Sequence, residues 1–391
     1  MTESCDVAII GAGLVGASLA LALEPSGLSV ALVETRVPAA PSASWDSRIY
    51  AISPGSAAFL AAVGAWQGVD AERVARVETM RIFGDAPSAR LEFNAYDAGL
   101  GELAFIAESG RLQSALWQCL EAAPQVRIFC PATCDALLQH ADYSEIVLAG
   151  GVTVRVQLLV GADGAQSWLR EQAGIQAIAH DYGQSGVVAN FACSLPHHHT
   201  AYQWFRADGV LALLPLPGNR ISMVWSTSET HAQELLALDA GGLAQCVSDA
   251  CDGVVGALEV ITPPAAFPLR LQRVDPFIKP RLALVGDAAH NVHPLAGQGV
   301  NLGLRDAREL AAVLCGRGAK STNGDCGDYA LLRRYERARK EDVLTMQLAT
   351  DGLQKLFASQ AVWLSRARNL GMRMVQSQSL LKSLLVKHAA A

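Results

Sequence analysis

The chain has 391 residues, more than one ordinary hydrophobic core accommodates, which predicts two domains. Apolar residues make up 51% and charged residues 17% of the chain, and this balance excludes an intrinsically disordered protein. The formal net charge of -6 gives no reason to expect a nucleic acid partner. The nine cysteines form no C-x-x-C pair, so the sequence predicts neither a zinc site nor a redox-active dithiol.

The first expected unit is a strand, a glycine-rich turn, a helix and a second strand. Residues 5–10 read CDVAII and have strand character, and GAGLVG follows at 11–16. A helix-length segment then ends near Gly27, and LSVALVE at 28–34 reads as a buried strand. This order is typical of a dinucleotide-binding βαβ unit. No basic segment precedes the stretch and glycines interrupt it, which argues against a signal peptide or a membrane span.

Each glycine of this turn has a physical role in such a unit. Gly11 makes the tight turn, Gly13 lets the backbone approach a pyrophosphate, and Gly16 lets the helix pack closely on the strand. Glu34 stands at the end of the second strand, where a carboxylate accepts hydrogen bonds from an adenosine ribose. The alternative is an ordinary glycine-rich turn, and the motif by itself leaves FAD and NAD open.

Two later strands run into a turn that contains an aspartate. QLLVGADG begins at residue 157 and carries Asp163, and RLALVGDAAH at 281–290 carries Asp287. Ligands of parallel α/β sheets bind at the carboxyl ends of the strands, so both aspartates are candidate ligand contacts. Asp and Gly are also common turn residues, so each motif taken alone favours a simple turn.

The rest of the chain divides into a strand-rich middle, a second glycine-rich turn and a helical tail. The middle predicts an antiparallel sheet with one face over a ligand. HPLAGQGVNLGLRDA at 293–307 opens a helix after Gly299, and the tail after Asp342 is helical by pattern and contains no Asp or Glu from residue 352 onward. Residues 197–199 are three histidines expected in a solvated loop. The strand-like runs are SGVVANFACSL (185–195), TAYQWF (200–205), VLALLPL (210–216) and RISMVWST (220–227).

The glycine-rich turn at 11–16 and the two aspartate motifs that carry Asp163 and Asp287, in this order, resemble the motifs of the flavoprotein aromatic hydroxylases with the p-hydroxybenzoate hydroxylase fold. Within that group, residues 47–66, 293–307 and 335–357 resemble the ubiquinone-biosynthesis hydroxylases. The resemblance implies an α/β fold: a Rossmann-like FAD-binding domain with an inserted mixed or antiparallel β-sheet substrate domain and C-terminal helices. The implied domains are a discontinuous FAD-binding domain at 1–75, 104–180 and 276–340, a substrate domain at 76–103 and 181–275, and a C-terminal helical region at 341–391.

The resemblance also assigns roles to residues around the cofactor. Pro294 is implied beside the isoalloxazine, next to where oxygen reacts, and His293 is a candidate for assisting phenol deprotonation, with structural hydrogen bonding as the alternative. Asp163 is also implicated in NAD(P)H binding. The implied FAD contacts are Gly11, Gly13, Gly16 and Glu34 at the ADP half, Arg48 at the pyrophosphate, Asp163 of the D-G motif, Gly286 and Asp287 at the ribityl chain, and Gly299, Val300 and Asn301 at the pyrimidine edge.

One segment departs from the pattern of that group. Relatives often have Glu-Asn before a helix where this chain reads E-S-G-R, so Glu108 matches and Ser109 replaces the asparagine. The resemblance therefore assigns no role to Ser109 or Arg111.

The implied activity is monooxygenation. FAD, reduced by NAD(P)H, reacts with molecular oxygen, and the resulting flavin C4a-hydroperoxide hydroxylates the ring of a polyprenylated phenol in ubiquinone biosynthesis. The alternatives are an FAD monooxygenase of a small soluble phenol and a non-catalytic isoprenoid-binding carrier. His290 and His293 lack companion ligands, so no metal site is expected.

The location implied by these features is cytoplasmic, with a peripheral position at the membrane as an option. Residues 352–391 carry only basic charges. They are expected either to pack on the FAD-binding domain or to dock at an anionic membrane surface or on other quinone-biosynthesis proteins.

Overall fold

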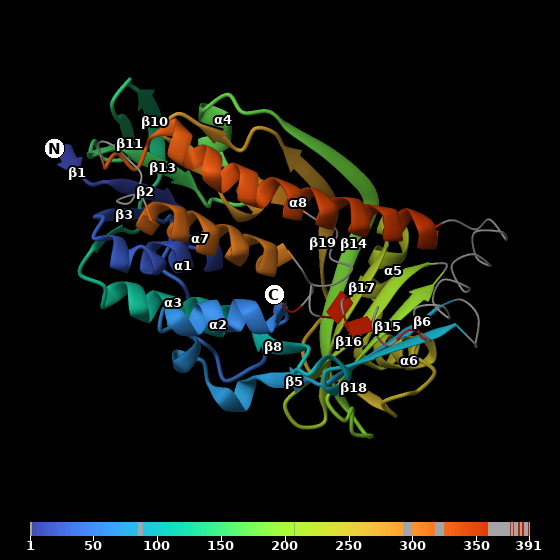
Figure 1. Ribbon diagram of the computed structural model, residues 1–391. Helices are drawn as coiled ribbons and strands as arrows, with labels where there is room; N and C mark the ends of the chain where they lie inside the picture. The colour runs from blue at the N-terminus through green and yellow to red at the C-terminus, as the bar shows by residue number, and fades with distance from the viewer. Residues whose placement is uncertain are drawn as a thin grey trace.

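The structure, a computed structural model, consists of a parallel sheet with helices packed against it and a larger mixed sheet beside it (Figure 1). The residues described are 2–84, 89–206, 208–291, 299–316 and 324–358, together with 376, 378, 382, 383, 385, 386 and 390.

A six-stranded sheet forms the centre of the first part. All neighbouring strands in it are parallel except β20 and β21. Every residue of β2 and β3 is buried, which explains why both segments read as continuous apolar runs. The strands, in spatial order, are β20 (Ile278–Lys279), β21 (Leu282–Leu284), β13 (Leu158–Gly161), β2 (Val7–Ile10), β3 (Val30–Val33) and β9 (Val126–Phe129).

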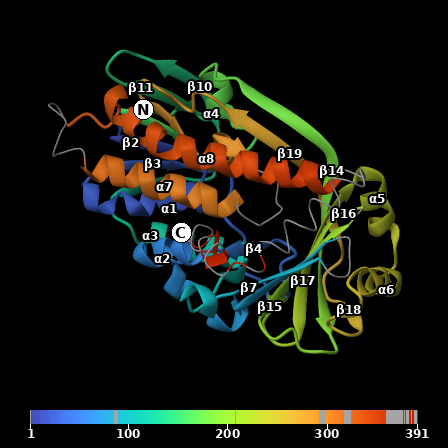
Figure 2. The same cartoon turned by 45° about the vertical axis from the view of Figure 1, so that its right-hand side comes forward.

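Helices pack together along this sheet. α1 (Leu14–Ala22) contacts both α3 (Ser109–Glu121) and α7 (Gly299–Cys315), and the long α8 (Tyr329–Ala358) lies along α7 (Figures 1 and 2). The predicted helix after Gly299 is therefore confirmed as α7.

The expected strand, helix and second strand at the start of the chain are confirmed as β2, α1 and β3. The helix ends at Ala22 rather than near Gly27. A short 3-10 turn at Glu24–Ser26 follows, because Pro25 has no N–H with which to continue the α-helical ladder.

Two smaller sheets and two short helices complete the first part. The four-stranded sheet contains β1 (Thr2–Ser4), β12 (Thr153–Val156), β11 (Ser144–Leu148) and β10 (Cys134–Gln139), and the three-stranded sheet contains β4 (Ile49–Ile52), β8 (Ala104–Glu108) and β5 (Ala75–Val77). The helices are α2 (Pro54–Ala62) and α4 (Trp168–Gln172).

The second part is the larger sheet, and the four strands predicted between 185 and 227 are confirmed in it. It is mixed because β15 runs parallel to β6, which arrives from a distant part of the chain. In spatial order its strands are β22 (His290–Asn291), β19 (Ala265–Val274), β14 (Ala177–Cys193), β17 (Arg220–Ser228), β16 (Gly209–Leu216), β15 (Thr200–Arg206), β6 (Thr79–Phe83) and β7 (Arg90–Asn94), with β18 (Leu258–Val260) beside β14.

The two faces of this sheet differ. Leu211, Leu213 and Met223 are fully buried in a core shared with α5 (Glu229–Ala237) and α6 (Ala240–Ala250). Ala212 and Leu214 alternate with them along β16 and are half-buried on the opposite face. Leu214 packs in a cluster with residues of β4, β5 and β8, so this second face is turned toward the first part of the molecule.

A buried carboxylate joins three segments of the first part. Asp306 of α7 has no exposed surface. Its Oδ2 accepts from the backbone N–H of Gly286 at 2.9 Å and lies 2.6 Å from His290 Nε2, and its Oδ1 accepts from Arg339 Nε of α8 at 2.7 Å. Burial opposes ionisation of Asp306, but His290 and Arg339 outweigh it and lower the pKa of the carboxyl. The paired charges therefore hold α7, α8 and the turn at 286–290 in one arrangement.

The first part of the C-terminal region belongs to a helix, α8, that starts earlier in the chain than the sequence predicted. α8 begins at Tyr329, so the proposed domain boundary at 341 falls inside it. Val343 and Gln347 are buried, and Asp351 accepts a hydrogen bond from Tyr182 of β14 at 3.3 Å. No helix in the described ranges combines the length and the apolar composition needed to cross a membrane.

The three consecutive histidines do not behave alike. His198 and His199 are exposed and adopt φ values of 50° and 53°. His197 is buried, and its Nε2 lies 2.9 Å from the carbonyl oxygen of Leu216. The expectation of a solvated loop is therefore wrong for His197, because its buried ring hydrogen-bonds the backbone at the end of β16.

Candidate functional site

The three glycines of the turn after β2 differ in whether the surrounding structure leaves room for a side chain. Gly11 has a φ of 98°, and a Cβ there would lie 2.4 Å from the carbonyl oxygen of Ala162. A Cβ on Gly16 would lie 2.0 Å from the carbonyl oxygen of Gly11, so this helix position tolerates no side chain. A Cβ on Gly13 would meet nothing within 4 Å. The fold itself requires Gly11 and Gly16, whereas the space beside Gly13 is open to a ligand.

Glu34 closes this turn from the end of β3. Its Oε2 accepts from the backbone N–H of Ala12 at 2.7 Å, and its Oε1 accepts from the backbone N–H and the hydroxyl of Thr35 at 2.7 and 2.9 Å. The carboxylate is only partly buried. It is therefore fixed at the edge of the turn with one side open to solvent, as ribose binding requires.

A second cluster brings together residues from three distant segments. The exposed guanidinium of Arg48 lies 5.5 Å from the centre of the Tyr50 ring. Burial raises the pKa of Tyr50, and hydrogen bonds to Ser109 and Arg48 oppose the shift. The Asp287 carboxyl keeps solvent access, but the protein around it desolvates it and raises its pKa, against the influence of His290 and Arg48. The charge of Arg48 therefore acts on the Asp287 carboxyl.

Tyr50 and Ser109 are site residues that the sequence analysis missed. Ser109 stands where relatives often have asparagine, and its side chain is close enough to Tyr50 to oppose the rise in the pKa of Tyr50. A signal for Tyr50 was present, because alternate residues of a strand share a face and Tyr50 follows Arg48 by two positions.

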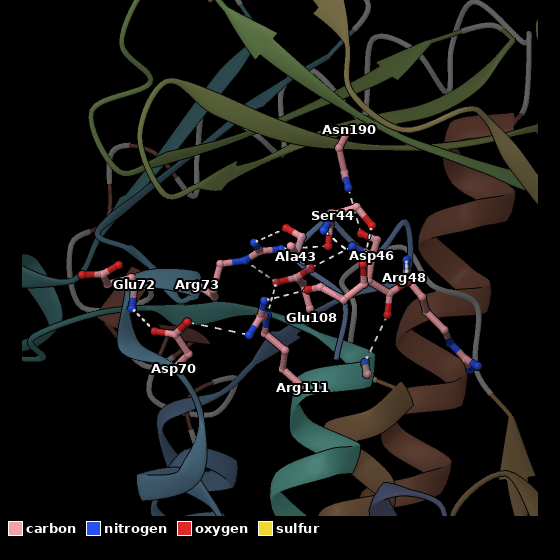
Figure 3. A network of polar contacts seen from close by, with 12 residues as sticks. Ala43, Ser44, Asp46, Arg48, Asp70, Glu72, Arg73, Glu108, Arg111 and Asn190 are labelled. Carbon is pink, nitrogen blue, oxygen red and sulfur yellow. Dashed lines mark hydrogen bonds and ion pairs between the residues drawn. The ribbon is translucent and has the colours of Figure 1, made fainter. Parts of the chain in front are cut away.

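A buried ion-pair network holds the segment that leads to Arg48 (Figure 3). Glu108 is 2% exposed; Arg73 donates to both of its oxygens at 2.8 Å, and Arg111 Nε donates to Oε2 at 2.9 Å. Glu108 Oε1 also accepts from the backbone N–H of Asp46 at 2.7 Å. Asp46 Oδ1 in turn accepts from the N–H of Arg48 at 2.9 Å. Glu108 therefore positions the backbone from which the Arg48 side chain extends.

The same network reaches the large sheet and explains Arg111. Asn190 Nδ2 of β14 donates to the carbonyl oxygen of Asp46 at 2.8 Å (Figure 3). Arg111 Nη2 donates to the carbonyl oxygen of Ser42 at 3.0 Å. Arg111, for which the resemblance implied no role, thus binds both the central carboxylate and the segment it fixes.

The two aspartate motifs differ in whether their buried polar groups have hydrogen-bond partners. Asp163 Oδ2 accepts from the N–H of Leu169 at 3.0 Å, but its buried Oδ1 has no partner among the described residues. Gly286 adopts a φ of 59°, and its N–H is bonded to Asp306. The unsatisfied oxygen of Asp163 lies in the turn after β13, next to the strand that leads into the glycine-rich turn.

The start of α7 is tied to β4 by a side chain. Asn301 Oδ1 accepts from the N–H of Ser53 at 2.9 Å, and its Nδ2 donates to the carbonyl oxygen of Ala51 at 2.8 Å. A Cβ on Gly299 would meet nothing within 4 Å, and Val300 is half-buried. Gly299–Asn301 therefore leave the helix start open on one side. His293 and Pro294 lie outside the described residues.

These residues fit the dinucleotide FAD. Open space at Gly13, a half-exposed carboxylate on Glu34 and an exposed cation on Arg48 match the glycine, ribose and phosphate requirements of such a ligand. The unpaired Asp163 Oδ1 supplies a buried acceptor that a bound ligand would satisfy.

Comparison with known proteins agrees with this fit. Residues 4–347 match the family model described as FAD binding domain. The chain is 37% identical to 3-demethoxyubiquinol 3-hydroxylase of Escherichia coli, over 99% of this chain and 98% of that protein. It is 31% identical to the mitochondrial ubiquinone biosynthesis monooxygenase COQ6 of Homo sapiens, over 98% of this chain and 92% of that protein.

Solved structures show the same fold at lower identity. The p-nitrophenol 4-monooxygenase PnpA from Pseudomonas putida has a TM-score of 0.79 at 16% identity, covering 100% of this chain and 99% of that one. A variant of HpxO from Klebsiella pneumoniae complexed with FAD has a TM-score of 0.74 at 19% identity, covering 99% of each chain.

The fold and the site define an FAD-dependent monooxygenase of the p-hydroxybenzoate hydroxylase type. The chain belongs to the FAD-binding hydroxylase family that contains the ubiquinone-biosynthesis enzymes named above.

The contrast between Gly13 and Gly16 gives a first prediction. Gly13→Ala adds a methyl group to open space, so the apo protein should keep its stability to within about 1 kcal/mol, whereas FAD affinity should fall at least about tenfold. Gly16→Ala should lower the free energy of unfolding by about 1–3 kcal/mol or more, because the added Cβ meets backbone. Urea unfolding of the apo proteins and FAD titration measure both. Unchanged FAD affinity in Gly13→Ala would show that no phosphate passes this residue.

The ion-pair network gives a second prediction. Glu108→Gln leaves two arginines beside a neutral amide and should lower the free energy of unfolding by about 3–5 kcal/mol. FAD affinity should fall as well, because the segment that carries Arg48 loses its anchor. Glu72→Gln is the matched control, since Glu72 is exposed and its carboxylate makes no ion pair among the described residues. Its effect should stay within about 0.5 kcal/mol. Equal behaviour of the two variants contradicts the anchoring role.

Proposed function

We propose that the protein hydroxylates the ring of a polyprenylated phenol in ubiquinone biosynthesis, using FAD, molecular oxygen and NAD(P)H as reductant. The observation that carries the proposal is the open space at Gly13, with the Glu34 carboxylate fixed at the same turn and the unpaired Asp163 Oδ1 nearby, in a chain that its ubiquinone-biosynthesis relatives match over nearly its whole length. The names of those relatives supply the substrate class.

The residues of this chain would bind and orient the cofactor rather than react themselves. Bound FAD supplies the activation of oxygen and the transfer of one oxygen atom to the ring. The N–H groups after Gly11 and the cation of Arg48 would hold the phosphates, and Glu34 would hold the ribose. Asp287 would accept from the ribityl hydroxyls. The open helix start at Gly299–Asn301 would direct N–H groups toward the pyrimidine ring, where reduction places negative charge.

One face of the large sheet is an argument for an apolar substrate. The half-buried Val210, Ala212 and Leu214 of β16 point away from α5 and α6 and toward the first part of the molecule. Such a face can bury an isoprenoid chain, and each buried CH₂ group contributes about 0.8 kcal/mol. A small soluble phenol offers this face no chain to bury.

The proposal is tested by purifying the protein and following NAD(P)H oxidation with isotopically labelled molecular oxygen. A phenol with one prenyl unit should be hydroxylated with one labelled oxygen atom. It should show a KM at least about tenfold lower than the same ring without the chain, because the prenyl carbons are buried. Equal KM values would favour the small soluble phenol. A flavin-loaded protein that hydroxylates neither compound would contradict the proposal.

We further propose that the basic C-terminal region holds the enzyme at an anionic membrane surface, where a polyprenyl substrate resides. Most of residues 359–391 lie outside the described part of the chain, and the support is the run of basic residues without acidic ones. Truncation after Arg368 should leave flavin content unchanged and lower recovery on vesicles that contain anionic lipid, most clearly at low salt. Unchanged recovery on vesicles would refute docking by this region.

A further inference from the structure

Arg305 of α7 is a buried cation whose hydrogen-bonding capacity is mostly unused. It is 6% exposed, and neither its Nε nor its Nη2 has a hydrogen-bond partner among the described residues. Its Nη1 lies 3.5 Å from Asp342 Oδ2, at the limit of a hydrogen bond. That same oxygen already accepts from Arg339 at 2.6 Å, so the contact of Asp342 with Arg339 is the closer of the two.

An arrangement of this kind is costly. A buried donor without an acceptor destabilises the folded state, and more so when it carries charge. The residues Leu302, Val343 and Met346, which pack together at the seam between α7 and α8, offer no side-chain acceptor. The two unpaired nitrogens of Arg305 therefore indicate an acceptor that the described part of the chain does not provide.

The position of Arg305 on its helix shows where that acceptor would be. Helical side chains lean toward the N-terminus, so the guanidinium lies over the turn that precedes its own Cα. That turn contains Asn301, one helical turn earlier and on nearly the same face of α7. Asn301 ties this turn to β4, the strand that carries Tyr50. The unused donors are thus directed toward the open start of α7.

We propose that Arg305 is a positioning residue for the flavin pyrimidine ring. Its unpaired donors serve the oxygen-bearing edge of that ring, directly or through one water. Its charge adds to the partial positive charge at the start of α7 and stabilises the negative charge that reduction places on the ring. Asp342 compensates this charge only in part, because its nearer oxygen is 3.5 Å from Arg305 Nη1 and already accepts from Arg339. The inference rests on the proposed binding of the pyrimidine ring at Gly299–Asn301.

The test compares Arg305→Met with Arg308→Met. Arg308 lies on the same helix, is exposed and makes no ion pair among the described residues, so it controls for the change in net charge. The flavin reduction potential and the dissociation constant for sulfite, which adds to electron-poor flavins, are measured on the FAD-loaded proteins. Arg305→Met should shift the equilibrium toward oxidised flavin about tenfold, about 30 mV for a two-electron couple. It should also weaken sulfite binding about tenfold.

Two further variants separate charge from structure. Arg305→Lys keeps the charge and should restore most of the potential, whereas Arg305→Gln keeps donors without charge and should not. If Arg305→Met fails to fold, Arg305→Gln carries the comparison. A potential and a sulfite affinity equal to those of Arg308→Met would overturn the role of Arg305, and would assign its donors to bound water. Failure of the wild-type protein to bind FAD would instead overturn the proposed function.

Discussion

The arrangement of the site depends on one fully buried carboxylate. Asp306 is hydrogen-bonded to Gly286 and His290 of the turn that contains Asp287, and to Arg339 of α8. Because its charge is buried, each of these partners must stay in place to compensate it. Asp287, the start of α7 and the buried Arg305 are consequently parts of one rigid unit, although Asp287 and α8 come from separate segments of the chain.

A second buried carboxylate, Glu108, orders the segment that precedes Arg48. Glu108 gathers Arg73 and Arg111 around the segment before Arg48, and Asn190 extends this set to the large sheet. Phosphate-binding cations on mobile loops lose affinity to the ordering of the loop, and a segment already ordered by buried pairs avoids that loss. Together the two networks place a cation and a carboxyl group along the line that a dinucleotide would follow.

Sequence patterns predicted the parts of this structure that are local. The strand, the turn and the helix around Gly11 and Gly16 follow from apolar periodicity and glycine spacing, which can be read from adjacent residues. The contact with Ala162 that excludes a side chain at Gly11 depends on the fold. The four strands of the large sheet between residues 185 and 227 were also predicted, because each is an apolar run bounded by turn residues. The roles of Glu108 and Arg305 could not be predicted. The pairing of Glu108 with Arg73, and the two Arg305 nitrogens without a partner among the described residues, depend on residues that only the fold brings together.

The path of the chain between the two parts has a consequence for unfolding. The strands β6 and β7 join the large sheet beside β15, while β5 and β8, on either side of them in the sequence, belong to a sheet of the first part. The chain returns to the large sheet with β14 and leaves it again after β19. Neither part is one continuous segment, so neither can be excised and folded alone. The two parts should therefore melt in a single cooperative transition, with the space for the flavin lost at the same moment as the core.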